Sequence, residues 1–122
     1  MKLHLNQDDA RYQIRGYQPG QVTVNNEILI RSFVVTATDL IRDWPPRSCE
    51  ELQAVHFELV VSLRPEVVIL GSGARQQFPT ADSLRPIVDA GIGVEVMDTG
   101  AACRTFNVLV AEGRRVAAAL LL

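Results

Sequence analysis

The sequence contains little of what marks a secreted, metal-binding or redox protein. Its 122 residues include only two cysteines, Cys49 and Cys103, and two histidines, His4 and His56. The cysteines are far apart and form no Cys-x-x-Cys pair, which is typical of a protein kept in a reduced, cytoplasmic compartment. No group of His, Cys, Asp or Glu has the spacing of a metal site, so we expect no metal ion.

Long hydrophobic runs are also missing. The longest wholly apolar run covers residues 116–122, whereas a membrane-spanning helix needs about 20 residues. Residues 1–11 are polar and lack the apolar segment of a secretory signal. We therefore expect no membrane span, and we interpret the C-terminal run either as a buried strand or as an edge that faces a partner. If the run is such an edge, the chain could be either a monomer or a weak homodimer.

Charge of one sign is not in excess either. The chain has 12 basic and 14 acidic residues, a formal net charge of −2, and its basic residues are scattered along the sequence. Such a surface offers no strong field for nucleic acid, so we expect no nucleic-acid partner. What the chain does have is a hydrophobic fraction of 48%, enough to bury the core of a single domain over residues 1–122.

The N-terminal third predicts β-structure. Two short segments, Val-Thr-Val at 22–24 and Ile-Leu-Ile at 28–30, flank Asn25 and Asn26, and asparagine tolerates the positive φ of a tight hairpin turn. Residues 32–37, SFVVTA, are rich in β-branched and aromatic side chains. We expect them to extend the second arm of the hairpin.

A loop and a helix are predicted next. The loop RDWPPR contains two consecutive prolines and Trp44, the single tryptophan. We interpret Trp44 as an anchor of its own loop, with an exposed partner surface as the alternative. Ser48 and Glu51 then have the spacing of a capping box, and the apolar periodicity that follows predicts a helix over 49–63.

The second half of the chain alternates between strands and helices. This order predicts parallel strands joined by right-handed crossovers, and together with the N-terminal hairpin it predicts an α/β fold with a mixed sheet. The predicted elements are a strand at 67–70, a helix from Thr80 or Ala81 to Ala90, a strand at 93–97, a helix from Asp98 or Thr99 to Glu112, and a strand at 116–121.

Two of these strands end in segments that could form a ligand site. Ligands of open α/β sheets bind outside the carboxyl ends of the strands, and the two ends share one crevice if the strands are neighbours. Backbone N–H groups at the start of a helix, with arginine side chains beside them, would suit an anion. The alternative is structural, because glycines permit tight turns and a cap residue serves its helix. The residues concerned are Gly71, Ser72, Gly73 and Arg75 after the first strand, and Asp98, Thr99, Gly100, Ala102, Cys103 and Arg104 after the second.

Neither segment completes a catalytic motif. A dinucleotide fingerprint needs a third glycine where the chain has Gln76, and Ser72 is not the centre of a Gly-x-Ser-x-Gly elbow. Cys103 lies in the first turn of a helix, where the pKa of a thiol can fall, but no histidine is close in sequence to act as its base. We therefore expect no cofactor and favour binding over catalysis, with a weak enzyme as the alternative.

Segments of the C-terminal half resemble a known family. They are PEVVILGSG from Pro65, VEVMDT from Val94, CRTFN from Cys103 and EGR from Glu112. They are similar to the small family of unknown function that includes mitochondrial respiratory complex I assembly factor 3 and the adipogenesis-associated domain protein of animals. The residues that match the family's motif positions are Gly71, Gly73, Asp98, Thr99, Ala102, Asn107, Glu112, Gly113 and Arg114.

The resemblance implies a three-layer α/β fold with a central mixed sheet and no established catalytic activity. It also implies a protein partner, since the mitochondrial member acts through protein contacts during the assembly of complex I. A mitochondrial presequence is missing, which predicts a bacterial-type member. We therefore expect a non-enzymatic binding or assembly module with a respiratory-chain partner. The alternative is a small-molecule or anion binder that uses the crevice, to which the resemblance adds Asn107.

Overall fold

The computed structural model describes residues 11–122, so His4 and the polar segment 1–10 lie outside the described residues. The described chain is built from short strands and three α-helices, with one 3-10 turn before the first helix. The elements are β1 (Ile14–Gln18), β2 (Gln21–Val24), β3 (Glu27–Leu29), β4 (Phe33–Val35), β5 (Leu40–Ile41), η1 (Cys49–Glu51), α2 (Ala54–Ser62), β6 (Val67–Gly71), α3 (Ala81–Asp89), β7 (Gly93–Met97), α4 (Thr99–Ala111) and β8 (Val116–Leu120).

A five-stranded mixed sheet forms the middle of the molecule, in the order β5-β4-β8-β6-β7. The strands β8, β6 and β7 are parallel, whereas β4 runs antiparallel to both β8 and β5. Every residue of β6 and β8 is buried, as expected for central strands that are covered on both faces. The predicted parallel β-α-β-α-β part is confirmed.

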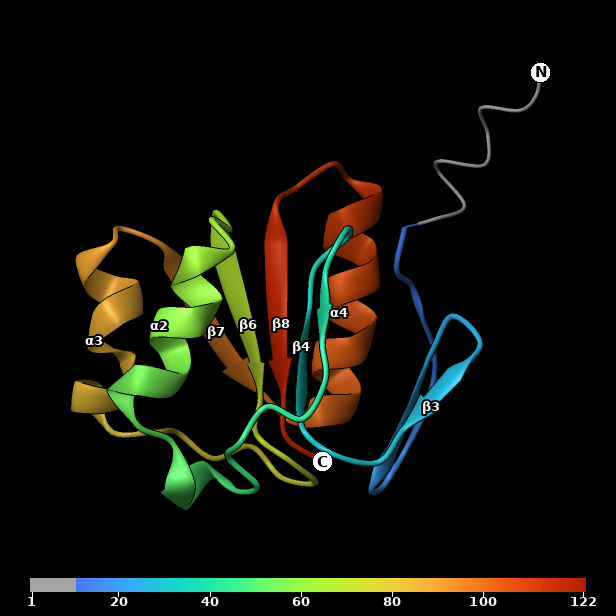
Figure 1. Cartoon of the computed structure of the whole chain (residues 1–122), viewed down its shortest axis with the longest axis horizontal. Helices are drawn as coiled ribbons and strands as arrows, with labels where there is room; N and C mark the ends of the chain where they lie inside the picture. Colours follow the sequence, from blue (N-terminus) through green and yellow to red (C-terminus); the bar gives the residue numbers. More distant parts are fainter. Residues whose placement is uncertain (1–10) are drawn as a thin grey trace.

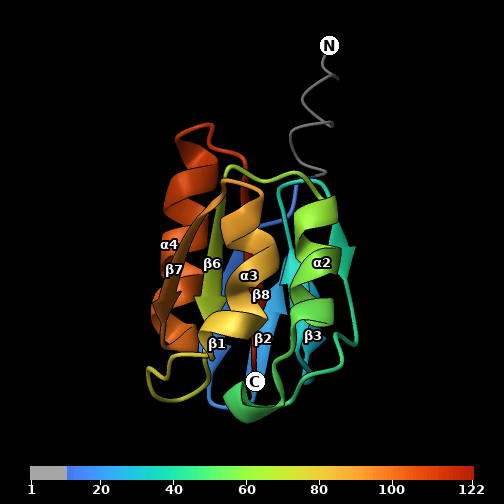
Figure 2. The same ribbon diagram turned by 90° about the vertical axis from the view of Figure 1, so that its left-hand side faces the viewer.

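Helices and a second sheet cover the two faces of the central sheet, which gives three layers (Figure 1). The helices α2 and α3 pack side by side on one face, as Figure 2 shows, over a core that includes Phe57 and Ile87. The other face is covered by α4 and by the antiparallel sheet β1-β2-β3, whose Val22 and Val24 share a core with Phe106. The predicted three-layer α/β fold with an N-terminal hairpin is confirmed.

The segment 32–37 departs from its predicted place. Its central residues form β4, which leaves the hairpin, crosses to the central sheet and pairs with β8. Phe33, Val34 and Val35 are all fully buried. Consecutive apolar residues of a strand point to opposite faces, so all three can be buried only in a sheet that is covered on both sides. The prediction that this segment extends the hairpin was therefore wrong.

The helix predicted over 49–63 is interrupted. The chain forms η1, becomes extended at Leu52, and starts α2 only at Ala54. The side chain of Ser48 caps nothing, and the capping box instead joins Gln53 and His56, with the Gln53 N–H donating to His56 Nδ1 at 3.0 Å. Leu52, where the chain is extended, is 6% exposed and belongs to the same core cluster as Phe57.

Residues 116–120 of the apolar run 116–122 form β8, which lies between β4 and β6. It is a buried central strand, so the first of the two interpretations of this run is confirmed and the partner-facing edge was wrong. Among the described residues, no helix has the length and apolar character needed to cross a bilayer.

Candidate functional site

The two predicted ligand segments lie side by side at the carboxyl ends of β6 and β7. These strands are neighbours, with Gly71 opposite Met97, so the expected meeting of the two strand ends is confirmed. The Thr99 N–H donates to the carbonyl oxygen of Gly73 at 2.9 Å, and the Gly73 N–H donates to Thr99 Oγ1 at 2.8 Å. Both segments lie at the lower end of the molecule in Figure 1, near the C-terminus.

Thr99 connects three segments at this point. Its fully buried hydroxyl donates to the Leu121 carbonyl oxygen at 2.7 Å, and the Leu121 N–H donates to the Gly71 carbonyl oxygen at 2.9 Å. A Cβ atom on Gly71 would lie 2.8 Å from Leu120 Cδ2 and 3.0 Å from Thr99 Cα, so only glycine permits this close approach. Gly71, Gly73 and Thr99 thus hold together the turn after β6, the start of α4 and the end of β8.

Most of the donors at the N-terminus of α4 are bonded within the chain. Asp98 is the N-cap residue, and its Oδ1 accepts the Ala101 N–H at 2.9 Å. Gly100 is covered, because a Cβ atom there would lie 3.1 Å from the ring of Tyr17. The N–H groups of Thr99, Ala101 and Ala102, which could face an anion at the helix start, are therefore bonded within the chain.

Ser72 holds the loop that follows β6. It is 5% exposed, and its Oγ donates to the Arg75 carbonyl oxygen at 2.7 Å and accepts the Gln77 N–H at 2.9 Å. Arg75 itself is exposed. The partners of Ser72 and Asp98 are all backbone groups, so neither side chain is bonded to the other or to Cys103. Within residues 11–122, no three His, Cys, Asp or Glu side chains come together to hold a metal ion.

The side of α4 that faces β1 carries the remaining candidates Cys103, Arg104 and Asn107, whereas Ala102 is buried in the core. The side chain of Asn107 donates to the Ile14 carbonyl oxygen at 2.6 Å and accepts the Ile14 N–H at 3.0 Å, as a neighbouring strand would. Burial raises the pKa of the Cys103 thiol to about 12 despite the positive charge of Arg104, which opposes the lowering that its helix position suggests. A hollow of about 240 Å³ at this place is lined by Ile14, Arg15, Gly16, Tyr17, Gly100, Cys103, Arg104 and Asn107.

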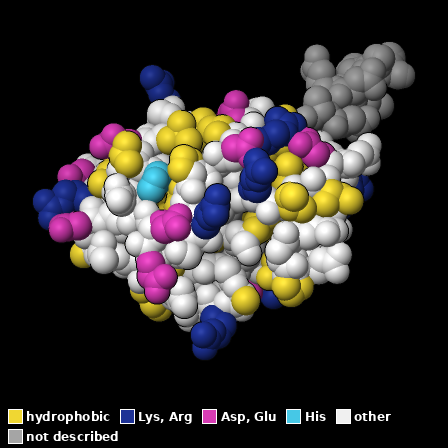
Figure 3. Space-filling view, turned by 60° about the horizontal axis from the view of Figure 1, so that its bottom comes forward, with side chains coloured by type: hydrophobic (Ala, Val, Ile, Leu, Met, Phe, Trp, Pro, Cys, Tyr) yellow, Lys and Arg dark blue, Asp and Glu magenta, His cyan; other side chains and the backbone are white. Residues whose placement is uncertain are grey.

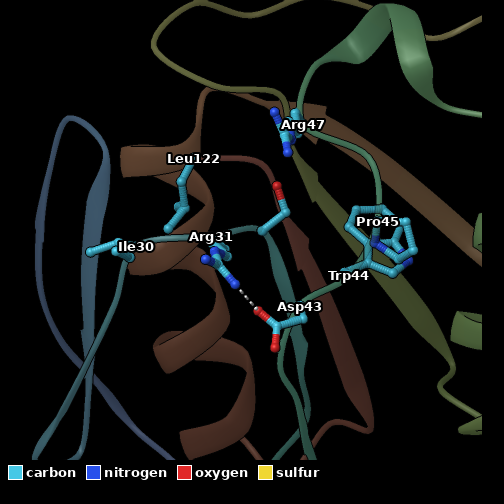
Figure 4. A pocket seen from close by; sticks show the side chains of 8 residues that line it. Ile30, Arg31, Asp43, Trp44, Pro45, Arg47 and Leu122 are labelled. Atoms are coloured by element: carbon cyan, nitrogen blue, oxygen red, sulfur yellow. Dashed lines mark hydrogen bonds and ion pairs between the residues drawn. The ribbon is translucent and has the colours of Figure 1, made fainter.

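A larger hollow lies near the same end of the sheet, and no sequence motif predicted it. It has a volume of about 560 Å³ and lies between the segment after β3 and the loop after β5 (Figure 4). We call it the Arg31 hollow. Leu122 forms part of its wall, so the hollow adjoins the end of β8 that Thr99 holds. Its lining residues are Ile30, Arg31, Ser32, Asp43, Trp44, Pro45, Arg47 and Leu122.

Trp44 fixes the loop side of this hollow. It is 3% exposed, its Nε1 donates to the His56 carbonyl oxygen at 3.2 Å, and its ring meets those of His56 and Phe57 edge-on. The interpretation of Trp44 as a loop anchor is confirmed. A buried indole with a bonded N–H holds the Pro-Pro loop in one position, so the hollow is preformed.

The rim of the Arg31 hollow combines charged and apolar side chains. Arg31 Nη1 lies 3.5 Å from Asp43 Oδ1, and both side chains are exposed (Figure 4). Beside them, Ile28 is 59% exposed and Ile30 is 67% exposed. A smaller hollow of about 170 Å³ shares Ile30, Arg31 and Asp43 and continues along β3. In Figure 3, which brings this end of the molecule forward, hydrophobic patches lie among side chains of both charges.

A sequence signal for this surface does exist. The run Ile28, Leu29, Ile30 places apolar side chains on both faces of a strand, and only Leu29 is needed by the core, where it is 8% exposed. The excess apolar face therefore could have been recognised as a contact surface.

The family described as "Protein of unknown function (DUF498/DUF598)" matches residues 14–121. The chain belongs to this family. The matched region includes all eleven candidate residues and every lining residue of the Arg31 hollow except Leu122. The resemblance expected from the C-terminal motifs is confirmed.

Several relatives have informative names. The chain is 34% identical over 110 residues to "NADH dehydrogenase (ubiquinone) 1 alpha subcomplex assembly factor 3" of Danio rerio, covering 88% of this chain and 63% of that protein. It is 26% identical over 119 residues to "13 kDa major membrane protein" of Francisella tularensis, with 95% of each chain covered. Among solved structures, a Xanthomonas campestris protein determined by NMR is 42% identical, with a TM-score of 0.85, over 99% of this chain and 92% of that one. The chain thus spans less than two thirds of the length of the Danio assembly factor.

Proposed function

We propose that this chain is a non-enzymatic assembly module that binds a protein partner at the Arg31 hollow and along β3. The observation that carries the proposal is the exposed pair Ile28 and Ile30 beside a preformed hollow. The similarity to a protein named as an assembly factor supports it. The internal hydrogen bonds of Ser72 and Thr99 support it as well, because these side chains are already used by the fold.

An extended segment of the partner fits this surface best. In the described structure β3 is an edge strand of the small sheet, paired with β2 on one side. A partner segment can lie along its outer side and place apolar side chains on Ile28 and Ile30. Arg31 and Arg47 at the rim favour an acidic residue next to that apolar segment.

An ion pair prepares β3 for this role. The guanidinium of Arg42 donates from Nε and Nη2 to the two carboxylate oxygens of Glu27, each at 2.6 Å. This pair joins β3 to the segment after β5, and it lowers the pKa of Glu27, so the carboxylate stays ionised. A strand that is held in place loses less conformational entropy when a partner binds.

The partner that we propose is a component of the respiratory chain, by analogy with the name of the Danio relative. A cytoplasmic location, suggested by the two unpaired cysteines, is part of the same proposal. So is a monomeric or weakly dimeric state before the partner binds.

Affinity purification of the tagged full chain from its native cells tests the proposal. Ile30→Asp places a charge in the proposed surface, and Val88→Asp is the matched control, because Val88 is 62% exposed on α3. Both changes are at exposed positions, so both variants should fold, which circular dichroism checks. We expect a stoichiometric partner with the unchanged chain and with Val88→Asp, and a loss of about tenfold or more with Ile30→Asp. Equal recovery with both variants, or no partner in any preparation, contradicts the proposal.

A small-molecule or anion binder, with weak catalysis included, is the second candidate function. The hollow between α4 and β1 favours it, because Arg15 and Arg104 line that hollow and no carboxylate does. An NMR titration with phosphate and small carboxylates tests it. Concentration-dependent shifts at Gly100 and Asn107 are expected, and their absence counts against this function.

A further inference from the structure

A second charged hollow lies at the opposite end of the central sheet. It has a volume of about 370 Å³ and is found where β6 and β8 begin, at the upper end of the molecule in Figure 1. Four arginines from three separate segments line it: Arg11 before β1, Arg64 after α2, and Arg114 with Arg115 before β8. We call it the arginine hollow.

Positive charge exceeds negative charge in the arginine hollow. Asp39 is the carboxylate of the lining, and Glu66 bonds to Arg114 and Arg115 from beside it. Four guanidinium groups against these two carboxylates leave a formal charge of +2, in a chain whose formal net charge is −2. The Asp39 carboxylate already accepts hydrogen bonds from the hydroxyls of Thr36 and Thr38. An anion that enters this hollow therefore meets a local field opposite in sign to the charge of the whole chain.

Glu66 fixes one side of the hollow. Its Oε2 accepts the Arg114 Nε–H at 2.9 Å, and its Oε1 accepts the backbone N–H of Arg115 at 3.1 Å. These bonds lower the pKa of Glu66, the backbone bond from Arg115 contributing most, so the clamp persists in mildly acidic solution. The Arg115 guanidinium is only loosely paired, with Nη1 3.8 Å from Glu66 Oε1, and its side chain is 71% exposed. Arg115 thus has donors left for another acceptor.

Arg64 stands at a position that favours glycine. It follows the C-cap residue of α2 with φ +59°, the left-handed conformation that is usually occupied by glycine when a helix ends in this way. A side chain is costly there, and the carbonyl oxygen of Arg64 receives only a 3.5 Å bond from Arg115 Nε. Within residues 11–122, neither Arg64 nor Arg11 forms an ion pair with a carboxylate.

We propose that the arginine hollow binds a phosphate group. Guanidinium groups donate pairs of parallel hydrogen bonds that match phosphate oxygens, and groups from three chain segments can surround one tetrahedral anion. A free phosphorylated small molecule and the headgroup of an acidic phospholipid carry the same chemistry. The site is distinct from the Arg31 hollow and from the hollow between α4 and β1, and the proposal does not depend on either.

Binding of two probes to the full chain tests the proposal and separates the two sources. Calorimetry with pyrophosphate tests a free phosphate group, and flotation with phosphatidylglycerol vesicles, against phosphatidylcholine vesicles, tests a headgroup. The variant pair Arg64→Gly with Arg115→Gln removes two charges from the arginine hollow. Arg75→Gln with Arg85→Gln removes the same charge at two exposed positions that line none of the three hollows.

We expect at least one probe to bind, more weakly at high salt, with affinity lowered about tenfold or more by the first pair and little by the second. Arg64→Gly alone should raise the melting temperature while it weakens binding, because it relieves the left-handed backbone at residue 64. A higher melting temperature together with weaker binding would show that the Arg64 side chain serves binding and does not stabilise the fold. Absence of binding to both probes, an equal loss with both variant pairs, or unchanged affinity in Arg64→Gly overturns the proposal.

Discussion

Replacing the hydroxyl of Thr99 tests the structural role of the predicted ligand segments. Thr99→Val keeps the shape of the side chain and removes its oxygen. The Gly73 N–H, 2.8 Å from Oγ1, then loses its acceptor, and the Leu121 carbonyl oxygen, 2.7 Å from Oγ1, loses its donor. Thr99 is fully buried and Leu121 is 1% exposed, so water cannot easily replace the second bond.

The expected loss of stability is large. An unsatisfied buried polar group costs about 1–3 kcal/mol. The cost for the Leu121 carbonyl oxygen should lie in the upper part of this range, because Leu121 is buried. The cost for the Gly73 N–H should lie in the lower part, because Gly73 is half-buried. We therefore expect Thr99→Val to lower the free energy of unfolding by about 3–4 kcal/mol, out of a total of about 5–15 kcal/mol for a domain. Thr99→Ser keeps the oxygen and loses one methyl group, which costs about 1 kcal/mol.

Urea unfolding followed by circular dichroism measures both variants on the same scale. The difference between valine and serine at position 99 isolates the hydroxyl. If Thr99→Val costs under about 1 kcal/mol, or no more than Thr99→Ser, the hydroxyl does not hold these segments together. In that case the burial of the hydroxyl would need another explanation, and a ligand site at these two segments would again be an alternative.

Three further changes test neighbouring features. Gly71→Ala forces a Cβ within 2.8 Å of Leu120 Cδ2 and should lower the free energy of unfolding by about 2 kcal/mol, measured in urea; an unchanged value would show that the turn has room. Asn107→Ala removes both bonds to the Ile14 backbone, so the Ile14 amide should exchange hydrogen faster by NMR, and undiminished protection would refute its role in holding β1. The Cys103 thiol, with a pKa of about 12 in the fold, should resist thiol reagents at pH 8 until urea is added, and rapid reaction of the folded chain would contradict its burial. Because burial raises this pKa in the folded state, Cys103 should also make stability fall as pH rises above the ordinary thiol pKa.

The sequence predicted the alternating half of the chain well. Glycines at the element ends account for this, since Gly91 and Gly113 take positive φ where α3 and α4 end. Asp98 caps α4 as expected, and the hairpin turn at Asn25 has φ +52°. These signals are local, and each acts within a few residues of its own position.

The failures came from long-range packing. Whether residues 33–35 join the hairpin or the central sheet depends on β8, which lies more than 80 residues later in the chain. The break at Leu52 accompanies the burial of its side chain in the core, which the local sequence pattern does not show. The Arg31 hollow has the same origin, because its walls come from residues 30–32, 43–47 and 122. The raised pKa of Cys103 could not be predicted from its helix position alone, because it depends on the burial of the thiol.

Site-specific photo-crosslinking in native cells tests the central claim, that β3 and the Arg31 hollow bind a protein partner. A photoreactive amino acid is placed at Ile30 in one variant and at Val88, equally exposed on α3, in the other. The account predicts one discrete crosslinked protein from position 30 and none from position 88. Crosslinking of the same protein from position 88 but not from position 30 would contradict it.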